Sequence, residues 1–344
     1  MNSRLKKVIY YLSTALVSGF VLIMFVIYPG INDNKPSMFV DTIYGKASKP
    51  FVYRTLLPTT VRILSAATPQ SLRNSIANKI ENNVSLRKLF LKLKWEREYA
   101  VEYSIAMLLM FLSLWGFSIA VKVFFNLFFK VNEWFAGLVS ILALAGLPPM
   151  FQYTSFVYDF PLLLLYTLGL IFLYKQDWKT FLIIFFIGCL NKETTILLTL
   201  IFYIYYKNKL QKDHFIKLLA VQLGIFLIVK ALLYVVFVSN PGTFVEFHLI
   251  DHNLRLLTGY NLSLITSLLI LLILVFYKWD EKPVFLKITH IAFIPLIILT
   301  FFLGYIDELR DYYEVYPVIV VFISYSVARV LGLKINILSQ NRTI

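Results

Sequence analysis

A short polar stretch, residues 41–58 (DTIYGKASKPFVYRTLLP), holds the side chains best suited to chemistry. Asp41 is a carboxylate that can act as a general base toward a hydroxyl group where water is restricted. Arg54 carries a planar guanidinium that can grip a phosphate through two hydrogen bonds, and Tyr53 adds a ring beside it. Because a long apolar block precedes this stretch, we expect it to form a site at a membrane surface that binds an anionic substrate.

Ionisable residues also interrupt the apolar blocks further along the chain. Lys192 and Glu193 divide one such block, and Asp159 lies near the start of another. A charged side chain at membrane depth is costly unless it is paired or faces a water-filled cavity, so these residues are candidate site residues. Glu308 and Arg310, in the sequence IDELRDYYEVYP between two apolar blocks, are placed to close the same site from another side.

Each of these residues also has a purely structural interpretation. Asp41 can cap a helix or lie in a solvated loop, and Arg54 can extend from the interface toward lipid headgroups. Lys192 and Glu193 can pair with each other or with a helix N-terminus. The segment with Glu308 can form an exposed turn. The sequence leaves both interpretations open for each residue.

Weaker candidates lie elsewhere in the chain. Asp33 falls in a turn-like INDN context, and Lys230, in the middle of an apolar block, is expected to pair inside the helix bundle. The motif formed by His248, Asp251 and His252 can ligate a metal, but its spacing is unspecific and favours a solvated loop.

Motifs for bound cofactors are absent from the sequence. It contains no Gly-rich phosphate loop, GxSxG elbow, HExxH motif or CxxC pair. The single cysteine, Cys189, lies in an apolar block and excludes both an intrachain disulfide and a cysteine-based metal cluster. We therefore assign no cofactor and no metal site, and a divalent metal has no support in the sequence.

The composition is that of a membrane protein. Hydrophobic residues make up 59% of the chain and charged residues only 15%. The apolar blocks do not alternate with a period of two, so they predict helices rather than barrel strands. We predict an all-α, polytopic integral membrane bundle, residues 1–344 forming a single transmembrane domain. About ten transmembrane helices are expected, at residues 8–28, 102–121, 133–150, 156–174, 180–190, 194–206, 216–238, 262–277, 288–304 and 315–333.

Basic residues flank these blocks in alternate loops and so predict the topology. The positive-inside rule places both termini in the cytoplasm. The long loop at residues 29–101 is expected outside, although it carries twelve basic and five acidic residues between positions 29 and 100, because long loops follow the rule weakly. The net charge of +14 belongs mostly to these flanks, so we expect membrane lipids and no nucleic acid as partners.

Two segments have an unusual predicted conformation. Residues 180–206 have basic residues at both ends, so both ends favour the cytoplasm and the segment predicts a re-entrant-like hairpin. Its tip would lie at membrane depth or in a cavity open to the outer face. Within residues 29–101, Leu86, Phe90 and Leu93 recur at helical spacing with basic residues on the other face, which predicts an interfacial amphipathic helix.

This layout resembles the polytopic GT-C-type membrane glycosyltransferases, which use polyprenyl-phosphate-linked sugars. In such enzymes a first helix precedes a long outer loop with interfacial helices and an acidic residue, followed by many spans with short loops. Local strings similar to those of uncharacterised bacterial members support the resemblance: Asp41 before PFVYRTLLP (residues 50–58), NKET (residues 191–194) and ELR (residues 308–310). The sequence departs from the group in lacking a paired Asp-Asp or Asp-Glu after the first helix.

The resemblance implies an activity, which is glycosyl transfer at the outer face of a bacterial inner (plasma) membrane. Asp41 would activate the hydroxyl of a glycan or lipid acceptor, while Arg54, Lys192 and Arg310 would hold the phosphate of the polyprenyl-phosphate-linked sugar. The alternative function is transport or flipping of a lipid-linked or anionic solute, with Lys230, Asp159 and the Lys192–Glu193 tip lining a path. A third option is a non-enzymatic subunit of an envelope assembly.

Overall fold

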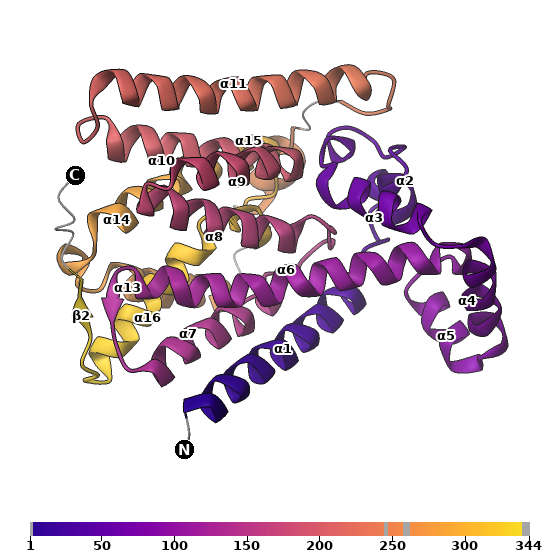
Figure 1. Ribbon diagram of the computed structural model, residues 1–344, viewed down its shortest axis with the longest axis horizontal. Helices are drawn as coiled ribbons and strands as arrows, with labels where there is room; N and C mark the ends of the chain where they lie inside the picture. The colour runs from indigo at the N-terminus through magenta and orange to yellow at the C-terminus, as the bar shows by residue number, and fades with distance from the viewer. Residues whose placement is uncertain (1–2, 244–246, 257–261, 339–344) are drawn as a thin grey trace.

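Helix α6 (Ala100–Asn126) is the longest helix and runs through the middle of the protein in the computed structural model (Figure 1). Its apolar residues lie on all sides, which is typical of a helix surrounded by others. Tyr103, Met110 and Leu114 are completely buried. The helix packs against α1 (Ser3–Ile27), α3 (Leu56–Ala66), α7 (Glu133–Ala145) and α8 (Asp159–Lys175). The structure describes residues 3–243, 247–256 and 262–338.

The segment between α1 and α6 is helical rather than an open loop. It contains η1 (Lys35–Ser37), α2 (Phe39–Ile43), η2 (Phe51–Tyr53), α3, α4 (Gln70–Asn82), α5 (Val84–Lys92) and η3 (Arg97–Tyr99). Helices α4 and α5 project beyond the end of the bundle (Figure 1). Asn83 begins α5 by accepting hydrogen bonds from the backbone of Ser85 and Leu86, each 3.0 Å long. The predicted amphipathic helix therefore corresponds to α5.

The remaining helices form layers on both sides of α6. They are η4 (Pro148–Met150), α9 (Trp178–Asn191), η5 (Glu193–Ile196), α10 (Leu197–Tyr206), α11 (Lys212–Val236), the π-helix η6 (Leu249–Asn253), α12 (Leu254–Leu256), α13 (Leu262–Phe276), η7 (Trp279–Glu281), α14 (Val284–Ile291), α15 (Phe293–Leu303), η8 (Leu309–Tyr312) and α16 (Tyr316–Val330). Two short antiparallel strands, β1 (Phe129–Lys130) and β2 (Asn336–Ile337), pair Phe129 with Ile337 and Lys130 with Asn336.

Within the described residues, five helical stretches are long and apolar enough to cross a membrane: Arg4–Ile27, Arg97–Asn126, Glu133–Met150, Lys212–Val236 and Val284–Leu303. The fold is nearly all-α, as predicted, and these apolar helices agree with the prediction of an integral membrane protein. Helices also occupy the other predicted spans, but they are shorter; α10, for example, has only 10 residues. The predicted span at residues 288–304 consists of two helices, α14 and α15, separated at Ala292.

The outer surfaces of α1 and α11 are strongly apolar. Leu16 and Phe20 on α1 are 74% and 64% exposed, and Leu227 and Val235 on α11 are 64% and 70% exposed. Contiguous apolar surface of this kind is unfavourable in water but suits contact with lipid chains. The two helices lie on opposite sides of the bundle, and their exposed faces are suited to contact with lipid (Figure 1).

Helices α9 and α10 form a hairpin that turns at Lys192, which has an extended backbone between α9 and η5. Trp178 at the start of α9 packs its ring against Phe202 and Tyr206 of α10, so the two open ends of the hairpin meet. Asp177 caps α9 by accepting a 3.2 Å hydrogen bond from the backbone of Thr180. The tip is joined to the segment after α1 by a 2.9 Å hydrogen bond from the Thr55 amide to the Leu190 carbonyl.

Candidate functional site

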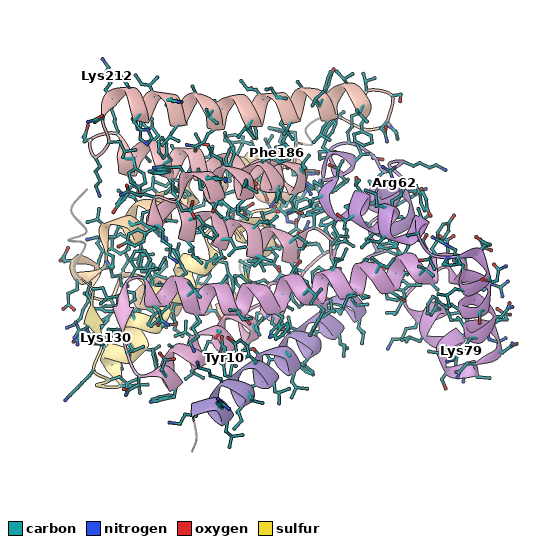
Figure 2. All side chains as sticks on the ribbon, in the orientation of Figure 1. Tyr10, Arg62, Lys79, Lys130, Phe186 and Lys212 are labelled. Carbon is teal, nitrogen blue, oxygen red and sulfur yellow. The ribbon has the colours of Figure 1, made fainter. Side chains whose placement is uncertain are left out.

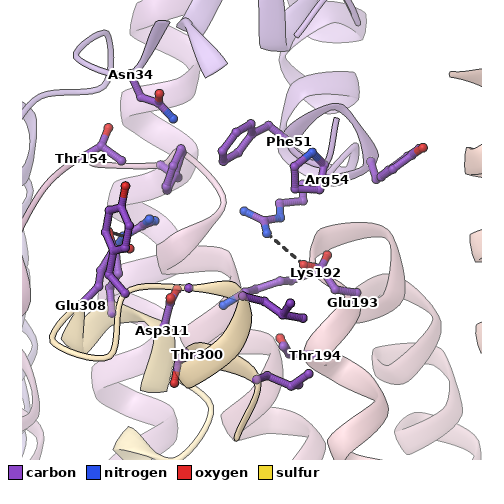
Figure 3. Close-up of a pocket in the computed structure, with 18 of the residues that line it drawn as sticks. Asn34, Phe51, Arg54, Thr154, Lys192, Glu193, Thr194, Thr300, Glu308 and Asp311 are labelled. Carbon is purple, nitrogen blue, oxygen red and sulfur yellow. Dashed lines mark hydrogen bonds and ion pairs between the residues drawn. The ribbon is translucent and has the colours of Figure 1, made fainter. Parts of the chain in front are cut away.

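A cavity of about 640 Å³ lies where the hairpin tip meets η2, η8 and the C-terminal ends of α11 and α15 (Figure 3). Its charged lining includes four basic and four acidic residues: Arg54, Lys192, Lys230, Arg310, Asp33, Glu193, Glu308 and Asp311. This size is in the range of pockets that hold small molecules. The lining residues come from parts of the sequence that are up to about 280 residues apart, so the fold assembles the site.

Arg54 projects from the end of η2 toward the hairpin tip (Figure 3). Its Nη2 donates a 2.9 Å hydrogen bond to Oε1 of Glu193, and its Nη1 donates to the hydroxyl of Tyr158. The guanidinium also stacks over the Tyr158 ring, with 4.4 Å between Cζ and the ring centroid. Its Nε is buried and has no hydrogen-bond partner in the described part of the chain. Arg54 is therefore fixed in orientation and keeps one unused donor.

The hairpin tip is held by a buried charge pair. Nζ of Lys192 lies 3.1 Å from Oε1 of Glu314, and these side chains are only 8% and 0% exposed. The hydroxyl of Thr194 donates to the same carboxylate oxygen. Breaking such a pair leaves a buried charge without compensation, so the pair holds the tip in one position.

Arg54 is the cation that contacts the Glu193 carboxylate, at 2.9 Å. Burial disfavours the charged form of Glu193, but the charges of Arg54, Lys230 and Lys192 outweigh burial and lower the pKa of its carboxyl to about 2. Lys230 extends from α11, and its Nζ donates a 3.1 Å hydrogen bond to the backbone carbonyl of Cys189. No carboxylate lies within ion-pairing distance of Lys230 in the described part of the chain. The arrangement is suited to an anion, and Glu193 now occupies it with 42% of its side chain exposed.

Arg310 lines the same cavity and is paired with two carboxylates of the protein. Its Nε donates a 2.6 Å hydrogen bond to Glu308, and its Nη1 lies 3.7 Å from Oδ2 of the buried Asp159. Its guanidinium stacks over Phe156 at 3.9 Å. Burial alone would lower the pKa of Arg310, but Glu308, Asp159 and Asp311 outweigh burial and raise it, so the residue stays charged. Burial raises the pKa of the Glu308 carboxyl, against the effect of Arg310.

Part of the cavity lining is apolar. Leu296, Leu299 and Leu303 of α15 and Tyr234 of α11 contribute to this apolar wall. Leu299 and Tyr234 are also 45% and 53% exposed at the outer surface. Helix α11 packs on α9 and α10, whereas α15 packs on α14, η6 and η8, so the two parts of the wall belong to different groups of helices. The cavity thus combines charged lining residues with apolar ones, and some of the apolar ones reach the exposed surface of the protein.

The structure brings together most of the residues predicted from the sequence. Tyr53, Arg54, Lys192, Glu193, Glu308 and Arg310 line the cavity, and Asp159 lies behind Arg310. Asp41 does not line it. Asp41 is in the first turn of α2, where its backbone carbonyl accepts hydrogen bonds from Lys46 and Ala47. Its position gives no support to its predicted role as a general base.

Other residues of the site were underestimated or missed in the sequence. Lys230 was expected to pair inside the bundle, and it does face the interior, but it lines the cavity. Glu314 was missed because its neighbours, Tyr313 and Val315, gave no sign that the carboxylate is buried. Asp33 was treated as a weak candidate because of its turn-like context, yet it lines the cavity.

The two histidines of the motif each pair with a carboxylate. His248 pairs with Asp251 at 3.0 Å, and His252 pairs with Asp307 at 2.8 Å. Among the described residues, no three His, Cys, Asp or Glu side chains come together as a group that could hold a metal ion.

Comparison with known proteins gives no relative: no protein-family model, curated protein or solved structure matches this chain. The function is therefore inferred from the site.

Proposed function

We propose that this protein is a membrane glycosyltransferase that binds a polyprenyl-phosphate-linked sugar in the cavity and transfers the sugar to a glycan or lipid acceptor at the outer face. The observation that carries this proposal is that Arg54, Lys192 and Lys230, from three separate segments, line one cavity together with apolar residues of α15 and α11. A donor with a phosphate between a sugar and a long hydrocarbon chain matches both features.

The phosphate would bind to the cations that line the cavity. The ammonium of Lys230, which donates to the Cys189 carbonyl, keeps further donors that a phosphate can use. The hydrocarbon chain would lie along the apolar wall of α15 and α11, near the surface exposed to lipid. The sugar would then lie in the wider part of the cavity, among its polar and aromatic lining residues.

The charges suit the reaction. Displacement at the anomeric carbon needs a base beside the attacking hydroxyl and cations beside the departing phosphate. In Figure 3 the segment with Asn34 lies on the opposite side of the view from Lys192 and Glu193. Asp33, next to Asn34, also lines the cavity. Acidic and basic groups are therefore available on two sides of the space where the sugar would bind.

The proposal includes a topology of about ten spans in a bacterial inner (plasma) membrane, with both termini in the cytoplasm. Its support is the distribution of basic residues. Lys130, in β1, and Lys212, the first residue of α11, lie at the end of the bundle opposite to Lys79, which lies on the projecting α4 (Figure 2). The shorter apolar helices would cross the membrane as part of the bundle rather than alone.

Photo-crosslinking tests the proposal directly. The purified protein in lipid nanodiscs would be exposed to a polyprenyl phosphate that carries a diazirine on its first isoprene unit. We expect crosslinks to peptides of α11 and α15, suppressed by excess unlabelled polyprenyl phosphate and weakened by Lys230→Gln. A label spread over all lipid-facing helices, or one that is not suppressed, would contradict the proposal.

Activity separates the enzyme from the alternative of a flippase. Membranes containing the protein would receive a panel of polyprenyl-phosphate hexoses and pentoses with radiolabelled sugars, together with a membrane extract as the acceptor source. We expect radiolabel to pass from the donor to another molecule. Proteoliposomes in which the labelled donor changes leaflet but keeps its sugar would instead assign the cavity to transport.

A further inference from the structure

A second cavity, also of about 640 Å³, lies beside the first. Its lining comes from the end of α1, the turn after it, the end of α5 and the loop before α8. Its polar lining includes Asp33, Lys92, Lys94, Gln152 and Tyr153. The proposed transfer reaction assigns the first cavity to the donor and leaves the acceptor without a site, which this second cavity can supply.

Asp33 and Tyr153 line both cavities, so the two spaces meet at these side chains. Asp33 forms an ion pair with Lys94, and a third of its side chain, 33%, is exposed. A group bound in the second cavity can therefore reach Asp33 from one side, and a sugar bound in the first cavity can reach it from the other.

The junction is held in place by the buried residue Asn32. Its Nδ2 donates hydrogen bonds to the Lys94 carbonyl at 2.8 Å and to the Tyr103 hydroxyl at 3.0 Å, while its Oδ1 accepts one from the Phe39 amide at 2.8 Å. Asn32 thus fixes the turn that carries Asp33 against the turn that carries Lys94. Precise positions at a point where two substrates would meet are what a transfer reaction requires.

The second cavity has a positive charge balance. Lys92 and Lys94 line it, and Asp33 is its one acidic lining residue. Because Asp33 is paired with Lys94, the charge of Lys92 is left over, and Lys92 has no ion-pair partner in the part of the chain that the structure describes. Gln152 adds a neutral hydrogen-bonding group. A ligand with a negative charge close to a hydroxyl group fits this lining better than a neutral one.

We infer that the second cavity binds an anionic acceptor, with a phosphate near Lys92, and that Asp33 takes the proton from the acceptor hydroxyl. This inference rests on the proposed transfer reaction. The hydroxyl oxygen forms a bond to the anomeric carbon of the sugar, and the bond from that carbon to the phosphate oxygen breaks. The phosphate leaves with the electron pair as polyprenyl phosphate, and the proton passes to Asp33 and then to water in the second cavity.

Binding tests the acceptor class without any transfer assay. The protein in neutral phosphatidylcholine nanodiscs would be titrated with fluorescent poly(glycerol phosphate), with fluorescent dextran as the neutral comparison. We expect poly(glycerol phosphate) to bind and dextran not to bind. Lys92→Glu should weaken the binding by at least about tenfold. Lys88→Glu, one helical turn earlier on α5 and outside the cavity lining, should change it by less than about twofold.

Competition identifies the source of the phosphate. If glycerophosphoglycerol, the headgroup of phosphatidylglycerol, displaces the polymer at similar phosphate concentration, the acceptor is a lipid headgroup. If only longer polymers displace it, the acceptor is an anionic glycan or polymer. Equal losses in Lys92→Glu and Lys88→Glu, or equal binding of dextran, would overturn the acceptor site even if donor crosslinking succeeds.

The role of Asp33 is tested by comparing binding with transfer. Asp33→Asn should keep the crosslink to polyprenyl phosphate and the binding of poly(glycerol phosphate), and it should lose sugar transfer by at least about a hundredfold. Asp280→Asn, a surface change near the other end of the bundle, serves as the matched control and should keep full transfer. Transfer retained in Asp33→Asn but lost in Asp41→Asn would overturn the assignment, whereas failure of the donor crosslink in the unmodified protein would overturn the proposed function itself.

Discussion

Arg54 and Glu193 form an ion pair of 2.9 Å although 139 residues separate them in the sequence. The pair joins the segment after the first helix to the tip of the α9–α10 hairpin. Arg54 is 11% exposed and Glu193 is 42% exposed, so the carboxylate is the more accessible partner. A ligand phosphate can therefore approach Arg54 by displacing Glu193 rather than by moving the arginine.

Neutralising Arg54 and neutralising Glu193 should have opposite effects on the binding of polyprenyl phosphate. Arg54→Gln should weaken binding of polyprenyl phosphate by about tenfold or more, because a charge-assisted hydrogen bond is lost. Glu193→Gln should keep or increase the affinity, because it removes the carboxylate that competes for the same cations. Binding to the protein in nanodiscs measures both. A similar loss in both variants would mean that the pair is only structural.

The sequence was sufficient to predict the helices because their signal is local. Apolar blocks bounded by Lys and Arg place most helices within a few residues, as for α11 at Lys212–Val236 against the predicted 216–238. The break at Lys192 was also predictable, since charged residues are unlikely to continue an apolar span. What the blocks do not give is a break inside a span. The predicted span at residues 288–304 falls within Val284–Leu303, which is long enough to cross a membrane but is divided at Ala292 into α14 and α15.

The site was predictable only in part, for a different physical reason. Polar residues between apolar blocks must lie near a membrane surface, and this placed Arg54, Lys192 and Arg310 at one face. The side chains that point into a shared cavity are determined by the conformation of turns, and the sequence of a turn has no periodic pattern from which to predict it. Asp41 and Asp33 lie in the same segment, yet only Asp33 lines the cavity, since Asn32 anchors its turn to Lys94.

The buried pair of Lys192 and Glu314 should contribute strongly to stability. Glu314→Gln alone should lower the free energy of unfolding by about 3–5 kcal/mol, because Lys192 remains buried without a counter-charge. Lys192→Met alone should cost a similar amount. The double variant should be much more stable than the sum of the two changes predicts, and thermal unfolding in detergent measures the difference. Additive losses would show that the two groups do not interact.

Gly188 provides a test of how the hairpin tip is positioned. A Cβ atom at this residue would lie 2.8 Å from Cγ2 of Thr195, so Gly188→Ala should displace η5 and lower the free energy of unfolding by about 1–3 kcal/mol. Gly224→Ala on α11 is the matched control, because nothing lies within 4 Å of its added Cβ, and it should be neutral or slightly stabilising. Polyprenyl phosphate binding should fall in the first variant alone.

Topology can be tested with single cysteines after replacement of Cys189 by Ala. Ser85→Cys on α5 should react with a membrane-impermeant maleimide added to intact cells. Lys209→Cys, in the turn between α10 and α11, should react only after the membrane is permeabilised. Labelling in the reverse order would invert the orientation and place the cavity on the cytoplasmic side.

Arg310 should not tolerate replacement by lysine. Its guanidinium simultaneously donates to Glu308 at 2.6 Å, lies 3.7 Å from Asp159 and stacks over Phe156 at 3.9 Å. A lysine ammonium has the same charge but no planar surface for stacking and no fixed fork of donors, so it cannot keep all three contacts.

We expect Arg310→Lys to lose nearly as much stability as Arg310→Gln, in thermal unfolding with and without polyprenyl phosphate. Arg54→Lys should likewise lose much of the ligand-induced stabilisation, because Arg54 donates to both Glu193 and Tyr158 and stacks over the Tyr158 ring. Full retention in Arg310→Lys would mean that only the charge of Arg310 matters, and its role would then be that of a phosphate ligand, as the resemblance to glycosyltransferases implies.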